Sequence, residues 1–373
     1  MLNLKTSSIA VITLLLVSLF SADSLSFESK QKEIEKLTQN ISTNLQLPAS
    51  VTNNGVAIAT VSDQTLLFSF NGLASGKTHK DIHNQAYSVN LATGKQKRLS
   101  SVPGDKGKLA SIAVTIKNRI FLIGGYTVAA DHSEISTPEI VEYLPSDDSY
   151  QAITNMPVPV DDTVALVYQQ RYLYLVSGWH DTDNVALVQV YDVEQERWFY
   201  ATPFPGAPVF GHAGGIVDNQ LLIVDGVKVN TLVNGKKRYV PSNENWMGQI
   251  NPTDPKIIEW KKVQKHPFAP LYRMASTGIK NRNEVVFAGG SDNPYNYNGV
   301  GYDGAPSEPS PAVFGFNFIN LSWSVYKPLV QPSMDHRGLL THLDEMFILG
   351  GMGAKQKVLS RVNRFQLNKV SGQ

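Results

Sequence analysis

The sequence predicts an all-β protein built from six similar units, each a small antiparallel sheet. A phrase of apolar residues that ends in glycine recurs six times, at intervals of about fifty to sixty residues. An aromatic residue is often followed by a second one seven positions later, as expected for two strands joined by a tight turn. The chain has 373 residues, of which 42% are hydrophobic and 17% charged, so it can bury a large core.

The recurring phrase is an apolar strand and the glycine that ends it. Its copies are TLLFSFNG ending at Gly72, RIFLIGG at Gly125, RYLYLVSG at Gly178, QLLIVDG at Gly226, EVVFAGG at Gly290 and EMFILGG at Gly351. The aromatic pairs are Tyr143 with Tyr150, Tyr191 with Trp198, and Phe316 with Trp323. We interpret these rings as structural, packed between neighbouring sheets.

This order, a glycine pair followed by a tyrosine and then a tryptophan, resembles the kelch repeat, and residues 45–367 resemble a kelch β-propeller. The sixth unit ends near Leu367 without an outer strand. NLQLPAS at residues 44–50 has the character of that missing strand. The prediction is therefore a six-bladed kelch-type β-propeller over residues 44–373, closed by an N-terminal strand that pairs into the last blade.

The first residues have the pattern of an export signal. MLNLKTSSIAVITLLLVSLFSADS carries an early lysine, an apolar stretch from Ile9 to Phe20 and small residues near its end. This predicts a signal peptide over residues 1–24, followed by a linker or short helix over residues 25–43. An uncleaved anchor is the alternative, but the apolar stretch is shorter than the ~20 residues of a membrane span. We expect a bacterial periplasmic or secreted protein with no membrane span after cleavage.

Composition narrows the partners and the cofactors. The net charge of +1 gives no electrostatic basis for binding nucleic acid or a membrane surface. The absence of cysteine excludes the cysteine-linked tyrosine cofactor of the galactose oxidase type of kelch enzyme. His79 and His83 lack an evident third ligand, so we expect no cofactor and no metal site, with calcium in the 291–312 loop left open.

Two loops are much longer than their counterparts in the other units. In a blade with four alternating strands, the loop after the second strand and the connection into the first strand emerge at the same end of the ring. The inserts at residues 227–249 and 291–312 follow second strands of adjacent units. We therefore expect both inserts side by side over one mouth of the central channel.

The inserts carry aromatic and polar side chains suited to a sugar, because tyrosine rings pack against sugar faces and asparagine or carboxylate oxygens bind hydroxyl groups. The candidate ligand-binding residues there are Trp246, Tyr295, Tyr297, Asn298, Tyr302, Asp303 and Glu308, with Asp292 beside them. The alternative is a surface loop that packs on itself.

Polar residues also precede the first strand of each unit. They are Asn54, Lys108, Asp162, His212, Arg273, His336 and Arg337. A propeller core does not require charges at these positions, so the set predicts a polar pocket of cationic character. Side chains that are solvated or that bridge neighbouring blades are the alternative.

The enlarged loop after FAGG in the fifth unit resembles the periplasmic N-acetylneuraminate epimerases, or sialate mutarotases. The resemblance implies interconversion of sialic acid anomers, with a glutamate as proton acceptor and arginines facing the substrate carboxylate. That glutamate follows the glycine of the fourth unit, where this chain has Val227 in IVDGVKV. The family's catalytic glutamate is thus missing.

Other groups can stand in for that glutamate, since mutarotation needs only a general acid and a general base of moderate pKa. The candidates are Asp225, His212 and Asp292, with Glu308 and His336 as further ones, while Arg273 and Arg337 could hold a substrate carboxylate and His336 could also bind the substrate. Asp225 can equally be the substitute for the first glycine of its repeat pair.

Three functions stay open on the sequence. The first is binding of a small polar or acidic sugar or glycan, with or without mutarotase-like catalysis. The alternative is a non-catalytic protein-interaction module that uses the same loop face to hold a protein partner. The third is a hydrolase or lyase that acts on a polysaccharide.

Overall fold

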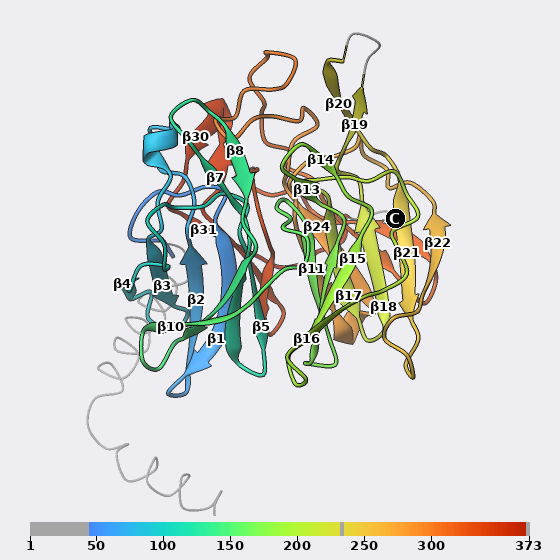
Figure 1. Ribbon diagram of the computed structural model, residues 1–373, viewed down its shortest axis with the longest axis horizontal. Coiled ribbons are helices and arrows are strands. Elements are labelled where there is room, and N and C mark those ends of the chain that lie inside the picture. The colour runs from blue at the N-terminus through green and yellow to red at the C-terminus, as the bar shows by residue number, and fades with distance from the viewer. Residues whose placement is uncertain (1–44, 232–234, 371–373) are drawn as a thin grey trace, which may run out of the picture. The chain divides into compact units, whose positions relative to one another are not determined.

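The computed structural model describes residues 45–231 and 235–370. The expected signal peptide and the linker at 25–43 lie outside the described residues and stay predictions. The described residues form five four-stranded sheets and one three-stranded sheet, which are the six blades of a propeller, and four two-stranded hairpins. This confirms the all-β propeller (Figure 1). None of the described helices has the length and apolar character that crossing a bilayer requires.

Each blade is an antiparallel meander, with its first strand lining the channel. Blades one to three consist of β1 (Gly55–Val61), β2 (Gln64–Phe70), β3 (Ala86–Asn90) and β4 (Gln96–Leu99); β5 (Ile112–Ile116), β6 (Arg119–Ile123), β9 (Glu139–Leu144) and β10 (Ser149–Asn155); and β11 (Val164–Tyr168), β12 (Tyr172–Val176), β15 (Val188–Asp192) and β16 (Arg197–Tyr200). Blades four to six consist of β17 (Ala213–Val217), β18 (Gln220–Val224), β21 (Asn245–Ile250) and β22 (Ile258–Val263); β23 (Ala275–Ile279), β24 (Glu284–Ala288), β25 (Val313–Asn317) and β26 (Ser322–Val325); and β27 (Leu340–His342), β28 (Glu345–Leu349) and β31 (Val362–Phe365).

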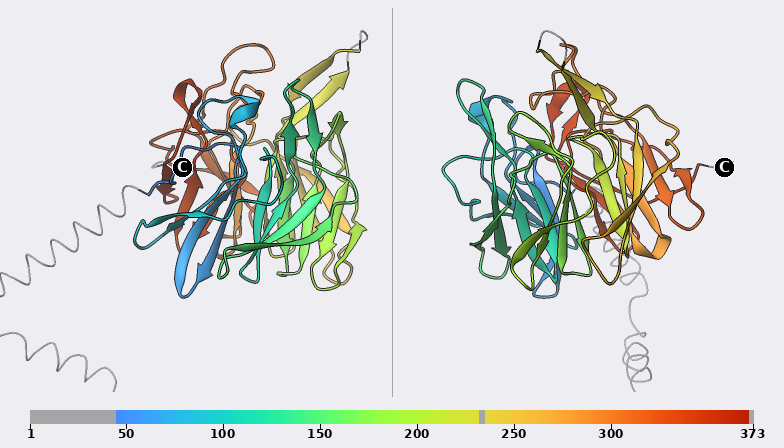
Figure 2. Two further views of the ribbon diagram at one scale, coloured as in Figure 1. Left: turned by 60° about the vertical axis from the view of Figure 1, so that its left-hand side comes forward. Right: turned by 45° about the vertical axis from the view of Figure 1, so that its right-hand side comes forward.

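The loops after the second strands build what we call the upper face. Four of them contain small hairpins: β7 (Tyr126–Val128) with β8 (Glu134–Ser136), β13 (Trp179–His180) with β14 (Asp183–Asn184), β19 (Val227–Thr231) with β20 (Lys237–Pro241), and β29 (Met352–Gly353) with β30 (Lys357–Val358). Two 3-10 turns, His79–Asp81 and Ala354–Gln356, also lie in these loops, and a third, Lys280–Arg282, joins β23 to β24. Figures 1 and 2 show β19–β20 and the 291–312 insert rising from the same face, as the sequence predicts.

The recurring glycine has a backbone reason. In all six blades the last two residues of the phrase have positive φ, a region that only glycine adopts freely. The second position is always glycine, with φ between 83° and 115°. The first position is held by Asn71, Gly124, Ser177, Asp225, Gly289 and Gly350. Two successive left-handed residues turn the chain sharply out of the second strand and onto the upper face.

This requirement leads to a prediction for Gly290. A Cβ at Gly290 would lie 2.7 Å from Met274 Cγ and 2.9 Å from the Tyr272 carbonyl oxygen. The Gly290→Ala variant is expected to lose about 3 kcal/mol of unfolding free energy, from left-handed strain and the clash together. Gly304 is the matched control, because its φ of 85° resembles the 83° of Gly290 but no atom lies within 4 Å of its Cβ position. Gly304→Ala should lose only about 1 kcal/mol of unfolding free energy. Urea titration of both variants measures the two losses, and equal losses would refute the steric argument.

The core lies between neighbouring blades, where the predicted aromatic pairs pack. Each pair faces across the third and fourth strands of its blade. The ring centroids lie 5.0 Å apart in Tyr143–Tyr150, 5.1 Å in Tyr191–Trp198 and 5.0 Å in Phe316–Trp323. The structural interpretation of these rings is confirmed.

The N-terminal segment closes the ring, as predicted. Gln46 bridges to Arg361, Leu47 N–H donates to the Ser360 carbonyl at 2.7 Å, and Val362 N–H donates to the Leu45 carbonyl at 2.8 Å. The side chains of Leu45 and Leu47 are buried between the first and last blades. The sixth blade thus takes its fourth strand from the opposite end of the chain.

Candidate functional site

Six equivalent backbone positions surround the upper mouth of the channel, one at the entry to each blade. All six have left-handed φ values between 46° and 70°. We call them the mouth ring: Asn53, Ala110, Asp162, Gly211, Arg273 and Asp335. Hydrogen bonds join neighbouring positions: Gly211 N–H donates to Asp162 O and Arg273 N–H to Gly211 O, both at 2.8 Å, whereas Ala110 N–H donates to the Asn53 side chain at 2.6 Å. Arg273 is not glycine, so its left-handed φ strains the backbone. Such strained residues persist only where the surrounding structure holds them, and they cluster at functional sites.

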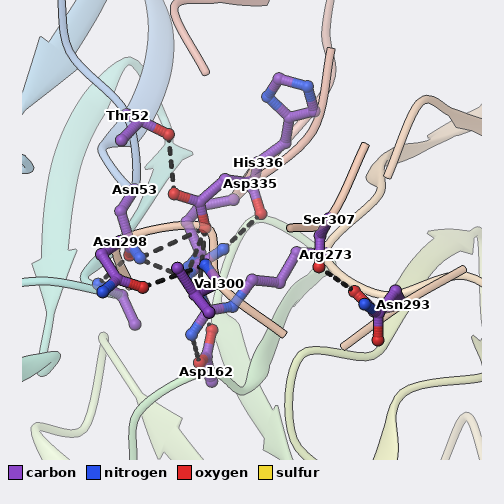
Figure 3. Close-up of polar contacts among 12 residues, drawn as sticks. Thr52, Asn53, Asp162, Arg273, Asn293, Asn298, Val300, Ser307, Asp335 and His336 are labelled. Atoms are coloured by element: carbon purple, nitrogen blue, oxygen red, sulfur yellow. Dashed lines mark hydrogen bonds and ion pairs between the residues drawn. The ribbon is translucent and has the colours of Figure 1, made fainter. Parts of the chain in front are cut away.

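Four buried charges converge on the mouth ring, and we call them the mouth network: Asp162, Arg273, Asp335 and Arg337. Arg273 contacts Asp162 and Asp335, with Nη1 to Asp335 Oδ1 at 3.0 Å. Arg337 Nη2 lies 2.8 Å from Asp162 Oδ1 and 3.6 Å from Asp335 Oδ1. Figure 3 shows Asp335 near the centre, where Thr52 Oγ1 also donates to it at 2.7 Å. No side chain of the network is more than 3% exposed, so the two positive and two negative charges compensate each other inside the protein.

The pKa of Asp162 reflects this compensation. Burial alone would raise the pKa of Asp162, but the nearby guanidinium groups of Arg273 and Arg337 more than offset it. The pKa of Asp162 therefore lies below its ordinary value, and the carboxylate stays ionised.

The mouth network lies between two cavities. The channel cavity, of about 440 Å³, is lined mainly by the first strands of the blades. The upper cavity, of about 70 Å³, lies among the loops of the upper face. Asp162 and Arg273 line both cavities, so these two side chains form the boundary between them.

The upper cavity has aromatic walls and acidic groups. Its other lining residues are Tyr126, Glu134, Asp161, Trp179, Phe210, Tyr239, Asn296, Tyr297 and Tyr302. The Tyr239 and Tyr302 rings stack at 4.1 Å, and Trp179 meets the Phe210 ring edge at 5.4 Å. The volume suffices for roughly five water molecules. The cavity therefore admits one edge of a small ligand, with the rest held in the opening above.

Two carboxyl groups in this wall have raised pKa values. Asp161 is 2% exposed and accepts a hydrogen bond from Ser136 Oγ at 2.6 Å. Burial and then the charge of Asp162 raise the pKa of Asp161 well above its ordinary value. Glu134 is exposed to solvent, but partial desolvation by the surrounding loops raises its pKa to about 7, against the opposing effect of Arg273 and with a smaller contribution from Asp162. Among the described residues, the carboxyl group of Glu134 has no hydrogen-bond or ion-pair partner.

The raised pKa of Glu134 predicts a pH-dependent stability. Between about 4.5 and about 7 the folded protein holds a proton on Glu134 that the unfolded chain has released, so stability falls as the pH rises through this window. The free energy of unfolding of Glu134→Gln should therefore exceed that of the parent by about 1 kcal/mol at pH 8 and by nothing at pH 4. Urea unfolding at the two pH values measures this difference. Glu139→Gln is the control, because Glu139 pairs with Lys108 at 2.7 Å and its pKa is lowered, so it should gain nothing at either pH. A Glu134→Gln effect that is equal at both pH values would contradict the prediction.

Some residues of the 291–312 insert reach the upper cavity and others stabilise the insert itself. Tyr297 and Tyr302 line the cavity, as expected. Tyr295 is fully buried, with its ring 5.4 Å from the Arg273 guanidinium. Asn298 accepts from Val300 N–H at 3.0 Å, Asp303 from Ala305 N–H at 2.9 Å, and Glu308 from Lys355 N–H at 3.1 Å. Asp292 is exposed and lines neither cavity.

The expected cationic pocket is wrong in its charge. Arg273 lines the upper cavity but shares its charge with two carboxylates, and Arg337 and His336 line the channel cavity instead. Burial lowers the pKa of His336 to about 4, so this side chain is neutral. In the sixth blade the position equivalent to Asp162 and Arg273 is held by Asp335, directly before the predicted His336 and Arg337.

Two predicted catalytic residues, Asp225 and His212, do not line the upper cavity. Asp225 accepts from His266 Nε2 and from the Leu271 N–H, both at 2.8 Å, and its φ of 60° shows that it replaces the first glycine of its pair. His212 is buried with its Nε2 2.8 Å from the Val176 carbonyl oxygen, and burial lowers its pKa to about 4.

Trp246 is also displaced from the site, because β21 begins at Asn245 and the predicted 227–249 loop therefore ends earlier. Its Nε1 donates to Glu244 at 3.2 Å on the outer part of the blade. Val227, at the position of the family's glutamate, is fully buried in β19.

The residues that the sequence reasoning missed include Tyr126, Glu134, Asp161, Trp179 and Tyr239. Tyr126 and Trp179 come directly after the glycine of their repeats. Residues at that position lie on the same face as the two long loops, so the sequence pattern could have identified both. Within residues 45–231 and 235–370, no group of three His, Asp or Glu side chains is arranged to hold a metal ion.

No family model matches the sequence. Kelch-like protein 15 of Gallus gallus is 25% identical over 134 residues, and that of Homo sapiens 24%; these matches cover 36% of this chain but only 27% and 22% of those proteins. The chain thus spans about a quarter of the length of these relatives.

Two comparisons extend over most of the propeller. N-acetylneuraminate epimerase of Salmonella typhi is 21% identical over 315 residues, which cover 72% of this chain and 78% of that protein. The solved structure described as "Structure of YjhT" superposes with a TM-score of 0.65 at 14% identity and covers 85% of this chain and 95% of that one. The protein is therefore a six-bladed kelch-type β-propeller with a distant resemblance to the N-acetylneuraminate epimerases.

Proposed function

We propose that this protein is an exported sugar-binding propeller that holds one edge of a small polar sugar in the upper cavity. The observation that carries the proposal is the combination of aromatic walls with carboxyl groups in one half-open space. Aromatic rings pack on sugar faces, and a few convergent polar groups orient the hydroxyls. The N-terminal pattern supports a periplasmic or secreted location in a bacterium.

The same carboxyl groups suit mutarotase-like chemistry on the bound sugar. Glu134, with a pKa of about 7, can accept the proton of the anomeric hydroxyl as the ring opens. Asp161, whose pKa is raised well above normal, can donate its proton to the ring oxygen. Closure of the ring on the other face reverses both transfers, so no cofactor is consumed. The distant resemblance to N-acetylneuraminate epimerase supports this class of reaction.

Proton NMR tests both steps on one sample. Saturation transfer to N-acetylneuraminate, N-acetylglucosamine and glucose reports binding, and exchange between the anomer signals reports catalysis. We expect transfer to at least one sugar, and its loss in Tyr302→Ala, which removes the ring stacked on Tyr239. Tyr200→Ala is the matched control, since Tyr200 is 51% exposed on β16 and lines neither cavity. No transfer to any sugar, or equal transfer with Tyr302→Ala, would overturn the proposal.

A protein-interaction module is the second candidate. The observation in its favour is the β19–β20 hairpin, which stands on the upper face beside the 291–312 insert (Figure 2). The partial match to Kelch-like protein 15 supports the same use of the fold. Affinity capture with and without residues 293–308 tests it, and recovery of the same partners in equal amounts would exclude the insert as the binding surface.

A further inference from the structure

The carboxyl groups of the upper cavity outnumber its cations. In the mouth network the charges of Arg273 and Arg337 are shared between Asp162 and Asp335. Glu134 and Asp161 lie above this balanced set. Neither forms an ion pair with any residue that the structure describes, so both carboxyl groups are available to a positive group of a ligand.

Other charged groups near the opening contact aromatic side chains rather than these two carboxyl groups. Lys237 Nζ lies over the Trp179 ring at 5.0 Å, on an exposed side chain of β20. His132 contacts Tyr297 through Nδ1 at 3.3 Å and is also exposed. The cation that acts on the pKa of both Glu134 and Asp161 is Arg273, whose charge is already compensated below.

The aromatic walls favour a positive group in the same place. Rings of tyrosine, tryptophan and phenylalanine attract ammonium groups through the negative faces of their π systems. Six aromatic residues line the upper cavity, and the contact of Lys237 with Trp179 is an ammonium already bound at this wall. A bound ammonium group would also lower the raised pKa values of Glu134 and Asp161, so that the carboxyl groups ionise beside it. Rings and carboxylates together form the usual setting for recognition of an organic cation.

A buried donor indicates the rest of the ligand. Arg273 lines the cavity with its side chain 3% exposed, and its Nε–H has no hydrogen-bond partner among the described residues. A buried unpaired donor is costly, so an oxygen of a ligand that reached this donor would be favoured. We infer that the ligand carries a protonated amine next to hydroxyl or ring oxygens, as an amino sugar does. This inference rests on the proposed sugar-binding function and defines its substrate class.

The test compares sugars that differ only in this group. Affinities of glucosamine, N-acetylglucosamine and glucose are measured at pH 7 by NMR titration, with methylammonium as a probe of the amine alone. We expect glucosamine to bind roughly tenfold more tightly than glucose or N-acetylglucosamine, as one charge contact of moderate strength gives. Glu134→Gln together with Asp161→Asn should reduce that preference to less than about threefold. Glu139→Gln, which removes an acidic charge that does not line the cavity, should leave the preference intact.

The outcomes separate the inference from the proposal beneath it. If the three sugars bind equally, or if the double variant keeps the preference, the amine inference is wrong and sugar binding stands. If no sugar binds while methylammonium does, the cavity recognises amines and the sugar proposal fails. If neither sugar nor methylammonium binds, both are overturned.

Discussion

Replacing Arg273 with methionine is expected to lower the free energy of unfolding by about 3–5 kcal/mol, because two buried carboxylates lose a shared cation. Asp162 and Asp335 would then face each other with only Arg337 to compensate them, in a site where no side chain is more than 3% exposed. The methionine keeps much of the volume that packs against Tyr272 and Tyr295. Urea titration followed by tryptophan fluorescence measures the loss.

Two controls make this result specific. Lys97→Met breaks a pair with Asp148 at 3.1 Å whose lysine is 61% exposed, and should cost less than about 1 kcal/mol. Combining Arg273→Met with Asp335→Asn removes one negative charge as well, so it should recover part of the stability. The compensation argument fails if Arg273→Met costs no more than Lys97→Met, or if the double variant is the less stable of the two.

The second large effect is expected at the closure of the ring. Changing Leu45 and Leu47 together to alanine should cost about 4 kcal/mol or more, since both side chains are buried where the first and last blades meet. The loosened strand would also expose the edge of β31 to pairing with other chains. Unfolding free energy and light scattering are the measurements.

Leu343→Ala is the control for this variant, because Leu343 is 85% exposed and the chemical change is the same. It should change stability by less than about 0.5 kcal/mol and leave the protein monodisperse. A loss below 1 kcal/mol in the Leu45 and Leu47 variant would show that the N-terminal strand is not needed for closure.

The fold was predictable because it depends on local patterns. Alternating apolar residues define the strands, and the glycine at positions such as Gly125 is fixed by a positive φ that other residues adopt with difficulty. Closure by residues 44–50 followed from counting strands, since five blades were complete and one lacked its outer strand.

The site was predictable only in part, because its charge depends on contacts between distant blades. Arg273 and Asp162 were both identified as candidates, but not their contact, which joins residues 111 positions apart in the sequence. Because of this contact, the site predicted to be cationic is compensated by carboxylates. His212 and Asp225 were predicted to be catalytic, but both are buried and bond to groups outside the upper cavity, which the sequence does not reveal. Glu134 is on a short hairpin without unusual composition, and only the arrangement of the loops raises its pKa to about 7.

The mouth ring has a consequence for how such a molecule can diversify. Its six positions share one left-handed backbone conformation, although their side chains range from glycine and alanine to aspartate and arginine. The backbone bonds, such as that from Arg273 N–H to Gly211 O, do not depend on which side chain is present. Two positions are fixed by their own contacts, because a Cβ at Gly211 would overlap the buried Tyr272 ring and the Asn53 side chain accepts a hydrogen bond from the Ala110 N–H at 2.6 Å. At Asp162, Arg273 and Asp335, substitutions that exchange charges in compensating pairs would alter the charge of the channel entrance without rebuilding the blades.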